Sequence, residues 1–569
     1  MQLTASQQHA IQQFQCFLQG DAECFILKGY AGTGKTFLLK RFTEMLAQWQ
    51  IDFQLVAPTG RATKILKERT QVDARTVHSL IYEMDMDQST IKAVEEQDVE
   101  QNKYELVFNL KTNGSRINTV YIVDESSMVS DKHSEHETLK FGSGQLLTDF
   151  LSYVNIRTTR RKIVFVGDHA QLPPVNSNES VCFNKDYLEE SFGLNVMVAE
   201  LTDVFRQGAD SSVLRAATAL RKQLDEESYN YFPVQVDAQD LIEYSVDEAV
   251  HHYTRNYTWQ KSIFITETNQ RAFEHTKHIR EQLGFRELSI GERLLVIKNT
   301  VINGERLFNG DFVRVDQVAA EPEIRKIPMR TKQGAEVVEL KYRDVTISYR
   351  TEDGQVRKQV PCKIFENHLW SSSIDISYEE RRAMIIDFQM RYPHTRQGTD
   401  GFKNLISNDL YFNALHVRFG YVITCHKAQG GEWNDVFVDL KYSQSITNRQ
   451  FFRWSYTAIT RARERIYFVN LPKQVKVEDD RFAIIRDMIG PLLAHVNAQI
   501  IEEQESAYQN LYYIRHGIEQ CKIIVHYNKK EKITKVRFVK GNSASEAVVT
   551  PIFQNLCGRS LYDAEPLLV

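Results

Sequence analysis

Residues 29–36 read Gly-Tyr-Ala-Gly-Thr-Gly-Lys-Thr, and these residue types at this spacing suit the binding of a nucleoside triphosphate. Glycines let backbone N–H groups turn towards phosphate oxygens, and the positive end of a following helix attracts the same anion. Lys35 can neutralise charge on the β- and γ-phosphates, and Thr36 can ligate Mg²⁺. We therefore predict a phosphate-binding loop that includes Gly29, Gly32, Thr33, Gly34, Lys35 and Thr36.

Two carboxylates and an amide follow apolar runs elsewhere in the chain. Asp124 and Glu125 come directly after the run 120–123. At a strand end, Asp124 can hold a hydrated Mg²⁺ while Glu125 polarises an attacking water. Gln171 comes shortly after the run 163–166 and begins the stiff segment Gln-Leu-Pro-Pro. We predict that this amide reports whether a γ-phosphate is present.

Two arginines lie in segments that suit the stabilisation of charge during phosphoryl transfer. Arg206 lies in the segment 201–207, and Arg461 lies in the segment 456–463. Arginines that arrive from another lobe can stabilise charge on the β/γ oxygens and couple the reaction to lobe closure. Taken alone, either arginine is more commonly a surface or ion-pair residue. The catalytic interpretation therefore depends on the motifs around them.

Apolar runs alternate with helix-like stretches along the chain, as they do in doubly wound α/β domains. The first set of runs lies at 25–27, 53–57, 120–123 and 163–166. The second set lies at 262–266, 420–424, 436–440 and 465–469. Because the second set is interrupted, we predict a second α/β lobe assembled from two separated segments.

Two insertions stand out from this pattern. The stretch from about 303 to 412 begins with alternating residues at 311–315 and is typical of a small β-barrel. The stretch 83–116 contains the apolar run 105–110 and predicts a hairpin that protrudes from the first lobe. Phe108 is one candidate for a strand-separating wedge, although core packing is the commoner role of a phenylalanine.

The composition is that of an ordinary globular chain. Its 569 residues, 42% hydrophobic and 25% charged, suggest three or four domains. No apolar run has the length of a membrane span and the N-terminus lacks a secretion signal, so we expect a cytoplasmic location. Seven widely spaced cysteines argue against disulfides, a zinc ribbon or an iron–sulfur cluster. A net charge of -4 predicts that any nucleic-acid surface is a local groove.

The motifs occur in the order found in superfamily 1 DNA helicases. Together they resemble the RecD-like and Dda-like members of the 5′-to-3′ branch, superfamily 1B, with its P-loop and UvrD-like C-terminal lobe. The resemblance covers residues 1 to about 470. Besides the segments described above, it rests on 3–11 with Gln7, 57–62, 76–80 and 420–432.

The resemblance implies an α/β fold with two RecA-like P-loop lobes, an inserted β-hairpin (pin), an inserted SH3-like β-barrel and a C-terminal accessory α+β segment. The expected first lobe is 1–200, including the pin at 83–116. The second lobe is 201–302 with 413–475, the barrel is 303–412, and the accessory segment is 476–569.

The resemblance also assigns roles to individual residues. Gln7 would contact adenine, and Gly430 and Glu432 would belong to the nucleotide site. The catalytic residues would be Lys35, Asp124, Glu125, Gln171, Arg206 and Arg461, with Thr36 and Asp124 at Mg²⁺. Single-stranded DNA would lie in a groove lined by Pro58, Thr59, Arg61, Thr76, His78, Thr424, His426 and Lys427. Such contacts to phosphates supply affinity without reading sequence.

The implied activity is that of an ATP- and Mg²⁺-dependent DNA helicase that moves along single-stranded DNA and opens duplex junctions. Whether the setting is DNA repair, DNA recombination or replication restart stays open. Two alternatives remain. One is a translocase, stimulated by single-stranded DNA, that remodels complexes without strand separation. The other is a nucleotide-gated nucleic-acid-binding module.

Two further segments fall outside the motifs. His133 and His136 have metal-like spacing, but no second pair of ligands lies nearby, so we expect a polar loop and no structural metal. The C-terminal segment contains a lysine-rich hairpin around 528–530 that could contact nucleic acid or a recruiting protein. A solvated charged face is the commoner interpretation of such a hairpin.

Overall fold

The structure, a computed structural model, describes residues 3–91, 104–134, 139–175, 177–203, 211–229, 231–302, 304–331, 334–351, 355–373, 376–395, 399–472, 489–490, 492–506, 509–517, 519–527 and 533–557. These residues divide into two compact units. The larger unit lies within 1–214, 237–439 and 457–469, and the smaller within 215–236, 440–456 and 470–569. None of the helices in the described ranges has the length and apolar character of a membrane span.

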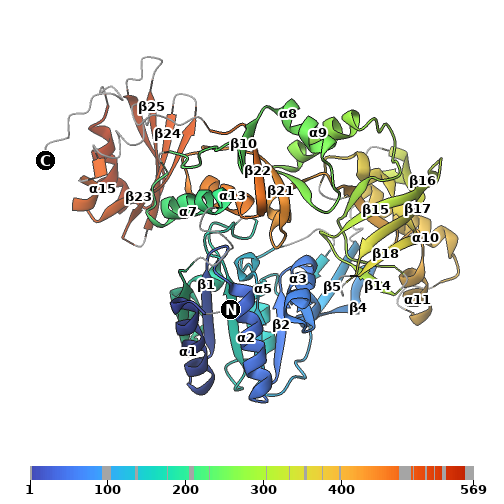
Figure 1. Cartoon of the computed structure of the whole chain (residues 1–569), viewed down its shortest axis with the longest axis horizontal. Helices are drawn as coiled ribbons and strands as arrows, with labels where there is room; N and C mark the ends of the chain where they lie inside the picture. The colour runs from blue at the N-terminus through green and yellow to red at the C-terminus, as the bar shows by residue number, and fades with distance from the viewer. Residues whose placement is uncertain are drawn as a thin grey trace. The chain divides into compact units, whose positions relative to one another are not determined.

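The first lobe of the larger unit is a parallel sheet with helices packed on it (Figure 1). Its strand order is β3-β2-β6-β8-β1-β9, and every neighbouring pair is parallel. The strands are β1 (Cys24–Gly29), β2 (Phe53–Ala57), β3 (Ala74–Thr76), β6 (Val120–Val123), β8 (Lys162–Gly167) and β9 (Val196–Leu201). The helices are α1 (Ala5–Gln19), α2 (Lys35–Gln48), α3 (Gly60–Thr70), α4 (Val77–Ile81), α5 (Leu146–Val154) and α6 (Lys185–Phe192), with 3₁₀ turns at Ser126–Met128 and Val181–Phe183. The predicted α/β lobe is confirmed.

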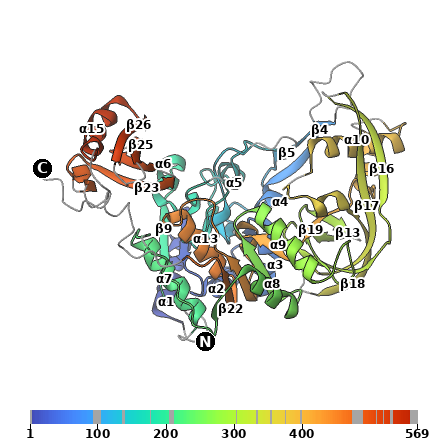
Figure 2. The same ribbon diagram turned by 90° about the horizontal axis from the view of Figure 1, so that it is seen from above.

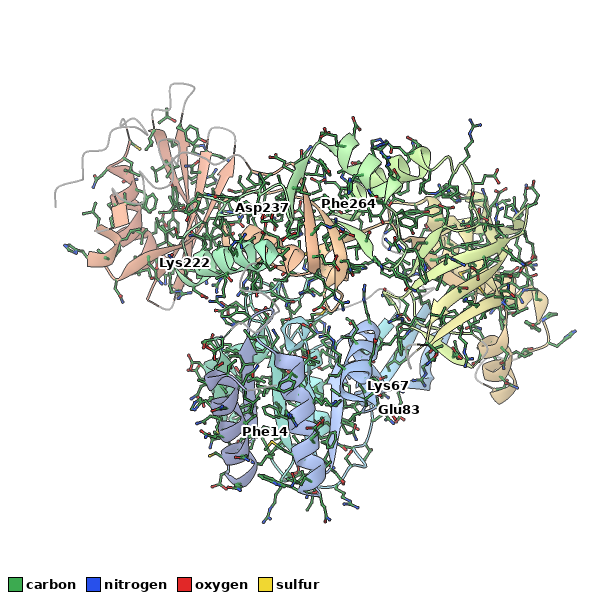
Figure 3. The ribbon with its side chains drawn as sticks, viewed as in Figure 1. Phe14, Lys67, Glu83, Lys222, Asp237 and Phe264 are labelled. Carbon is green, nitrogen blue, oxygen red and sulfur yellow. The ribbon has the colours of Figure 1, made fainter. Side chains whose placement is uncertain are left out.

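Apolar residues on both faces of the central strands explain this sheet. Phe25, Ile26 and Leu27 of β1 are all fully buried, as expected where helices cover both sides of a parallel sheet. Phe14 of α1, labelled in Figure 3, stacks on Phe42 of α2 with 3.9 Å between ring centroids. Strand β8 pairs with both β6 and β1. The carboxyl ends of these three strands, which carry the predicted chemistry, therefore meet at one edge of the sheet.

Strands β4 (Tyr82–Ile91) and β5 (Tyr104–Leu110) form an antiparallel pair where we predicted a hairpin. Strand β7 (Leu139–Phe141) adds in parallel to β5, so part of the expected polar loop is a strand. Phe108 stacks on Phe141 with 4.6 Å between centroids and packs on the core of the first lobe. In this structure Phe108 therefore packs against other apolar side chains. His133 Nδ1 lies 3.1 Å from the carbonyl oxygen of Ser143, and His136 lies outside the described residues.

The second lobe is also a parallel sheet, with the order β10-β22-β21-β11-β20. Phe264 of β11, labelled in Figure 3, stacks on Phe437 and His275 in its core. The strands are β10 (Leu241–Tyr244), β11 (Ser262–Thr266), β20 (Val422–Thr424), β21 (Trp433–Asp439) and β22 (Ala462–Val469). The helices are α8 (Val246–Arg255), α9 (Asn269–Gln282) and α12 (Cys425–Ala428), while α7 (Ser212–Asp225) and α13 (Arg449–Ile459) contain residues of both units.

A closed ring of strands lies between the two halves of the second lobe, with the pairing β15-β12-β19-β18-β17-β15. The predicted barrel, 303–412, leaves out β12 and β19, whereas the ring contains both strands. Closure without those two strands would expose sheet edges. The elements are β12 (Arg293–Val296), β13 (Thr300–Ile302), β14 (Glu305–Leu307), β15 (Phe312–Val318), β16 (Glu323–Thr331), β17 (Gly334–Arg350), β18 (Val356–Phe365), β19 (Leu415–Phe419), α10 (Tyr378–Arg391), α11 (Asp400–Asn408) and a 3₁₀ turn at Glu366–Trp370.

The smaller unit contains an antiparallel sheet with the order β23-β24-β25-β26. Helix α15 (Ser543–Gln554) covers one face of this sheet (Figure 2). The strands are β23 (Ala498–Ser506), β24 (Gln509–His516), β25 (Glu519–Tyr527) and β26 (Ile533–Lys540). The predicted basic hairpin is therefore present as β25 and β26, with its tip outside the described residues.

Candidate active site

The phosphate-binding loop joins the buried strand β1 to helix α2. Gly32 and Gly34 have φ angles of 83° and 87°, a region that glycine enters without the penalty of a Cβ. Lys35 Nζ donates to the carbonyl oxygens of Gly29 at 2.6 Å and Tyr30 at 2.9 Å. The ammonium group therefore lies folded over its own loop. A bound triphosphate would offer it anionic oxygens in place of these two carbonyls.

Gln7 joins helix α1 to the same loop. Its Nε2 donates to the carbonyl of Thr33 at 3.0 Å, and its Oε1 accepts from the backbone N–H of Thr4 at 3.2 Å. Gln7 is only 3% exposed, and a Cβ on Gly34 would lie 2.6 Å from its Nε2. These contacts hold the amide of Gln7 against the phosphate-binding loop, a position that is compatible with the predicted adenine contact.

The two carboxylates lie at the end of β6. Asp124 Oδ1 accepts from the backbone N–H of Glu125 at 2.9 Å. Burial, and then the neighbouring charge of Glu125, raises the pKa of Asp124 to about 7. Glu125 has a φ of 50°, in the left-handed region, and its Oε2 is enclosed without a hydrogen-bond partner among the described residues. An enclosed carboxylate oxygen beside a proton-binding aspartate fits a site that receives Mg²⁺ and an ordered water.

Gln171 lies in the loop after β8 and is 3% exposed. Its Oε1 is also enclosed without a partner in the described part of the chain. The next residue is held from the second lobe, because Leu172 N–H donates to Thr457 Oγ1 at 2.9 Å and Gln429 Nε2 donates to the carbonyl of Leu172 at 2.9 Å. We call these two hydrogen bonds the Leu172 clamp. They tie the Gln171 loop directly to the other lobe.

Arg461 reaches the cleft from the second lobe and is 5% exposed. Its guanidinium donates to the carbonyls of Thr457 at 2.9 Å and Gly431 at 3.3 Å, and to the hydroxyl of Thr460 at 3.0 Å. These acceptors are all neutral. A phosphate oxygen would therefore give this buried cation an anionic acceptor, which its hydrogen bonds to the described residues do not provide.

A cleft of about 440 Å³ brings most of the predicted nucleotide-site residues together. From the first lobe it is lined by Gln7, Gly32, Gly34, Lys35, Thr36, Asp124, Glu125 and Gln171, and from the second by Gly430, Glu432 and Arg461. Gly29 and Thr33 form the loop behind this wall, where Thr33 is fully buried and its hydroxyl donates to Tyr30. Arg206 lies outside the described residues.

Comparison with known proteins agrees with this geometry. Residues 2–232 match the family model of an AAA domain, and residues 419–469 match that of the UvrD-like helicase C-terminal domain. The RecBCD enzyme subunit RecD of Buchnera aphidicola is 22% identical over 483 residues, which cover 82% of this chain and 73% of that protein. These matches make the chain similar to RecD-like helicases of superfamily 1B.

Two further proteins are similar to this chain. An uncharacterised protein of Methanocaldococcus jannaschii is 22% identical over 567 residues. This alignment covers 95% of the chain but only 42% of that relative. Among solved structures, the Pif1 helicase from Bacteroides in complex with ADP-AlF3 and ssDNA is 16% identical, with a TM-score of 0.39 over 82% of this chain and 92% of that one.

Arg69 is a charged residue of the cleft that the sequence did not predict. Arg69, at the end of α3, lines the cleft and donates to Thr36 Oγ1 at 3.4 Å and to Glu432 Oε2 at 3.1 Å. The same Glu432 oxygen accepts from Arg463 at 3.1 Å. Glu432 therefore bridges cations from both lobes. No short-range spacing links Arg69 to Thr36, so only the fold could bring them together.

The predicted DNA groove begins with threonines whose hydroxyls are already engaged. Thr59 caps α3 by accepting from Ala62 N–H, and Thr76 caps α4 by accepting from Ser79 N–H. Thr424 precedes α12 and makes no capping hydrogen bond. Thr59 and its neighbour Pro58 follow β2, and Thr76 ends the adjacent strand β3. The first-lobe residues thus lie side by side at one sheet edge, which is compatible with the predicted groove.

The side chain of Arg61 lies beside aromatic rings. Its guanidinium lies 4.3 Å from the ring centroid of Trp433 and 5.4 Å from that of Phe312, and its Nη1 is enclosed. Burial lowers the pKa of Arg61 to about 10, although Asp311 acts in the opposite direction. Cations stack on aromatic faces in this way at packed interfaces. In this structure Arg61 therefore packs α3 against the second lobe and the ring, and its contact with DNA phosphates stays a prediction.

The remaining predicted groove residues have mixed surroundings. His78 is exposed and its ring packs 5.3 Å from that of Phe141. Burial lowers the pKa of His426, so this imidazole is neutral at physiological pH. Lys427 and Thr424 line a small pocket together with Arg418. Two cations and a hydroxyl at one pocket suit a phosphate, and the DNA contact remains our proposal for these residues.

Proposed function

We propose that the chain is an ATP-dependent DNA helicase that moves along single-stranded DNA, in the 5′-to-3′ direction, and separates duplex strands. The observation that carries this proposal is the cleft in which Lys35, Asp124 and Glu125 of one lobe face Arg461 of the other. A site divided between two lobes changes when they move. Nucleotide turnover there would therefore open and close the lobes.

The residues suit hydrolysis of the γ-phosphate. Mg²⁺ held by Thr36 and Asp124 would neutralise charge on the β- and γ-oxygens. Glu125 would take the proton of a water whose oxygen attacks the γ-phosphorus, while the bond from that phosphorus to the β-phosphate oxygen breaks and ADP leaves. Lys35 and Arg461 would stabilise the negative charge that collects on the transferred group and the leaving oxygen.

The Leu172 clamp offers a route from chemistry to movement. Gln171 would contact the γ-phosphate, and the following residue is already hydrogen-bonded to Thr457 and Gln429 of the second lobe. A shift of Gln171 after phosphate release would therefore pull on both lobes. The lobes would pass single-stranded DNA along the groove that Pro58, Thr76 and Lys427 help to line.

Turnover of ATP with and without single-stranded DNA tests the enzymatic part of the proposal. We expect strong stimulation by DNA in the parent chain and loss of turnover in Lys35→Ala and Glu125→Gln. Lys185→Ala removes an exposed lysine of α6 and serves as the control. Normal DNA-stimulated turnover in either active-site variant would overturn the assignment. Absence of turnover in the parent chain would favour a nucleotide-gated binding module.

Duplexes with a single-stranded tail on one side test direction and strand separation. A 5′-tailed duplex should be opened and a 3′-tailed one should not, and preferential opening of the 3′-tailed substrate would refute the direction. Matching RNA strands test the choice of nucleic acid. Deletion of 92–103, between β4 and β5, should abolish unwinding and spare DNA-stimulated turnover if the hairpin is the pin. Turnover with translocation but no unwinding by the parent chain would favour the translocase alternative.

A further inference from the structure

The sheet of the smaller unit has two unlike faces. On one face, Tyr512, Ile523 and Val525 are fully buried against Val549 and Phe553 of α15. Strand residues alternate between faces, so the residues between these point to the opposite side, away from α15. We call this opposite side the open face.

The strand register groups basic residues on the open face. Lys522 pairs with Lys540 across β25 and β26, Ile524 pairs with Arg537, and His526 pairs with Lys535. Lys535, Arg537 and Lys540 are exposed and form no ion pair with described residues. Unpaired cations on neighbouring strands repel each other unless an anion lies between them.

The next strand adds an aromatic ring to these cations. Tyr513 of β24 pairs with Lys522, and Leu511 pairs with Ile524. Lys522 Nζ donates to the hydroxyl of Tyr513 at 3.1 Å and lies 5.0 Å from the centroid of its ring. Glu502 is the acidic residue that the register places on the described part of this face, opposite Tyr513 on β23. The face is therefore basic, with one aromatic ring and aliphatic side chains among the cations.

We propose that the open face is a second binding surface for single-stranded DNA, separate from the groove of the larger unit. This inference rests on the proposed function, because it adds a contact for the same substrate. Lys535 and Arg537 lie two residues apart on one strand, about 7 Å at the usual rise, and Lys540 and Lys522 continue the row across two strands. Such a row suits consecutive phosphates, and Tyr513 offers a surface on which a base can stack.

The features of the open face favour nucleic acid over an acidic protein segment. Exposed strand cations without an ion pair among the described residues give affinity for a phosphate backbone without sequence preference. A groove for a protein segment would need a larger apolar area, whereas the apolar side chains here, Leu511 and Ile524, lie singly between polar neighbours. A protein ligand is accordingly the alternative outcome of the experiment.

Salt dependence of DNA binding tests this proposal in the full chain. A triple variant, Lys535→Gln, Arg537→Gln and Lys540→Gln, removes three cations and keeps side chains of suitable length. The control, Lys185→Gln, Lys222→Gln and Lys326→Gln, removes three exposed lysines elsewhere. Affinity for fluorescent single-stranded DNA is measured by anisotropy over a range of salt concentrations, without nucleotide. Three lost phosphate contacts should reduce the slope of log K against log salt by about 2, since each contributes ~0.7 on single strands.

The outcomes separate this proposal from the proposed function. We expect the reduced slope in the triple variant alone, together with unchanged ATP turnover at saturating DNA and a higher DNA concentration for half-maximal stimulation. An unchanged slope of log K against log salt in the triple variant would overturn the proposal and favour an acidic protein as the ligand of the open face. If the triple variant loses affinity for duplex DNA alone, the choice of single-stranded DNA as the ligand is wrong. If ATP turnover is absent from the parent chain, the helicase assignment fails while the binding measurement still decides this one.

Discussion

Removal of one hydroxyl from the Leu172 clamp should uncouple the lobes while leaving both of them folded. Thr457→Val keeps the shape of the side chain and deletes the acceptor for Leu172 N–H. That bond is 2.9 Å long and buried, so the variant leaves a buried N–H unpaired at a cost of about 1–3 kcal/mol. The carbonyl of Thr457 still accepts from Arg461, so the arginine keeps its main support.

The cost should fall on the state in which the lobes are closed on nucleotide, if the clamp persists there. A loss of about 1–3 kcal/mol of transition-state stabilisation corresponds to roughly a 5- to 150-fold decrease in DNA-stimulated kcat/KM for ATP. Gln429→Leu removes the second bond of the clamp, from Nε2 to the carbonyl of Leu172. Because both bonds hold one residue, the double variant should lose less than the sum of the single losses.

Steady-state ATP turnover over a range of DNA concentrations measures these effects. Thr43→Val is the matched control, because Thr43 is also buried but its hydroxyl donates within α2, to the carbonyl of Lys40. Thermal unfolding of each variant checks that the fold is retained. If Thr457→Val turns over ATP at the parent rate, or falls only as far as Thr43→Val, the clamp does not couple the lobes and this reasoning is refuted.

Three further predictions concern the cleft itself. The pKa of Asp124 is raised to about 7, so at lower pH Mg²⁺ must displace a proton from this carboxylate. Mg²⁺-dependent nucleotide affinity should therefore rise about tenfold per pH unit below pH 7 and level off above it. An affinity that does not change with pH would contradict this prediction. Arg69→Ala should weaken the binding of a triphosphate more than that of a diphosphate. It should change the free energy of unfolding by less than about 1 kcal/mol, since the ion pair of Arg69 with Glu432 is exposed. Calorimetric titration of both nucleotides, with Arg69→Lys as the control, checks this prediction. Gly34→Ala should abolish nucleotide binding in a folded protein, because the φ angle of Gly34 is 87° and the new Cβ would lie 2.6 Å from Gln7 Nε2. If the variant still binds a fluorescent ATP analogue, the loop adapts to the extra atom and the prediction is wrong.

The sequence predicts the catalytic half of the cleft because the chemistry there depends on short segments. The loop 29–36, the pair Asp124 and Glu125, and Gln171 each follow an apolar strand, and strand order then brings them to one edge. Arg461 was predicted through its motif, and its neutral surroundings became visible only in the fold. Glu432 was predicted as a nucleotide-site residue, but its bridge between Arg69 and Arg463 depends on three segments that meet only after folding.

Tertiary packing gives some residues surroundings that their local sequence does not indicate. Arg61 lies in a motif that implies phosphate contact, yet the ring of Trp433 lies beside its guanidinium. The predicted barrel does not include β12 and β19, because residues of the second lobe flank both strands and nothing in their own alternation shows which sheet they join. In both cases the partners are distant in the chain, and periodicity cannot identify such partners.

Helix α3 touches different parts of the larger unit at its two ends. Gly60 packs against Phe308, and Lys64 pairs with Asp311 of the ring, while Arg69 reaches the nucleotide cleft at the other end. Eleven residues span about 16 Å as a helix, and a hydrogen-bonded helix does not stretch. If a phosphate draws the backbone of α3 towards the cleft, the end of the helix at the ring would therefore move by a similar distance. Helix α3 is thus a rigid element that would transmit movement from the nucleotide cleft to the ring of strands.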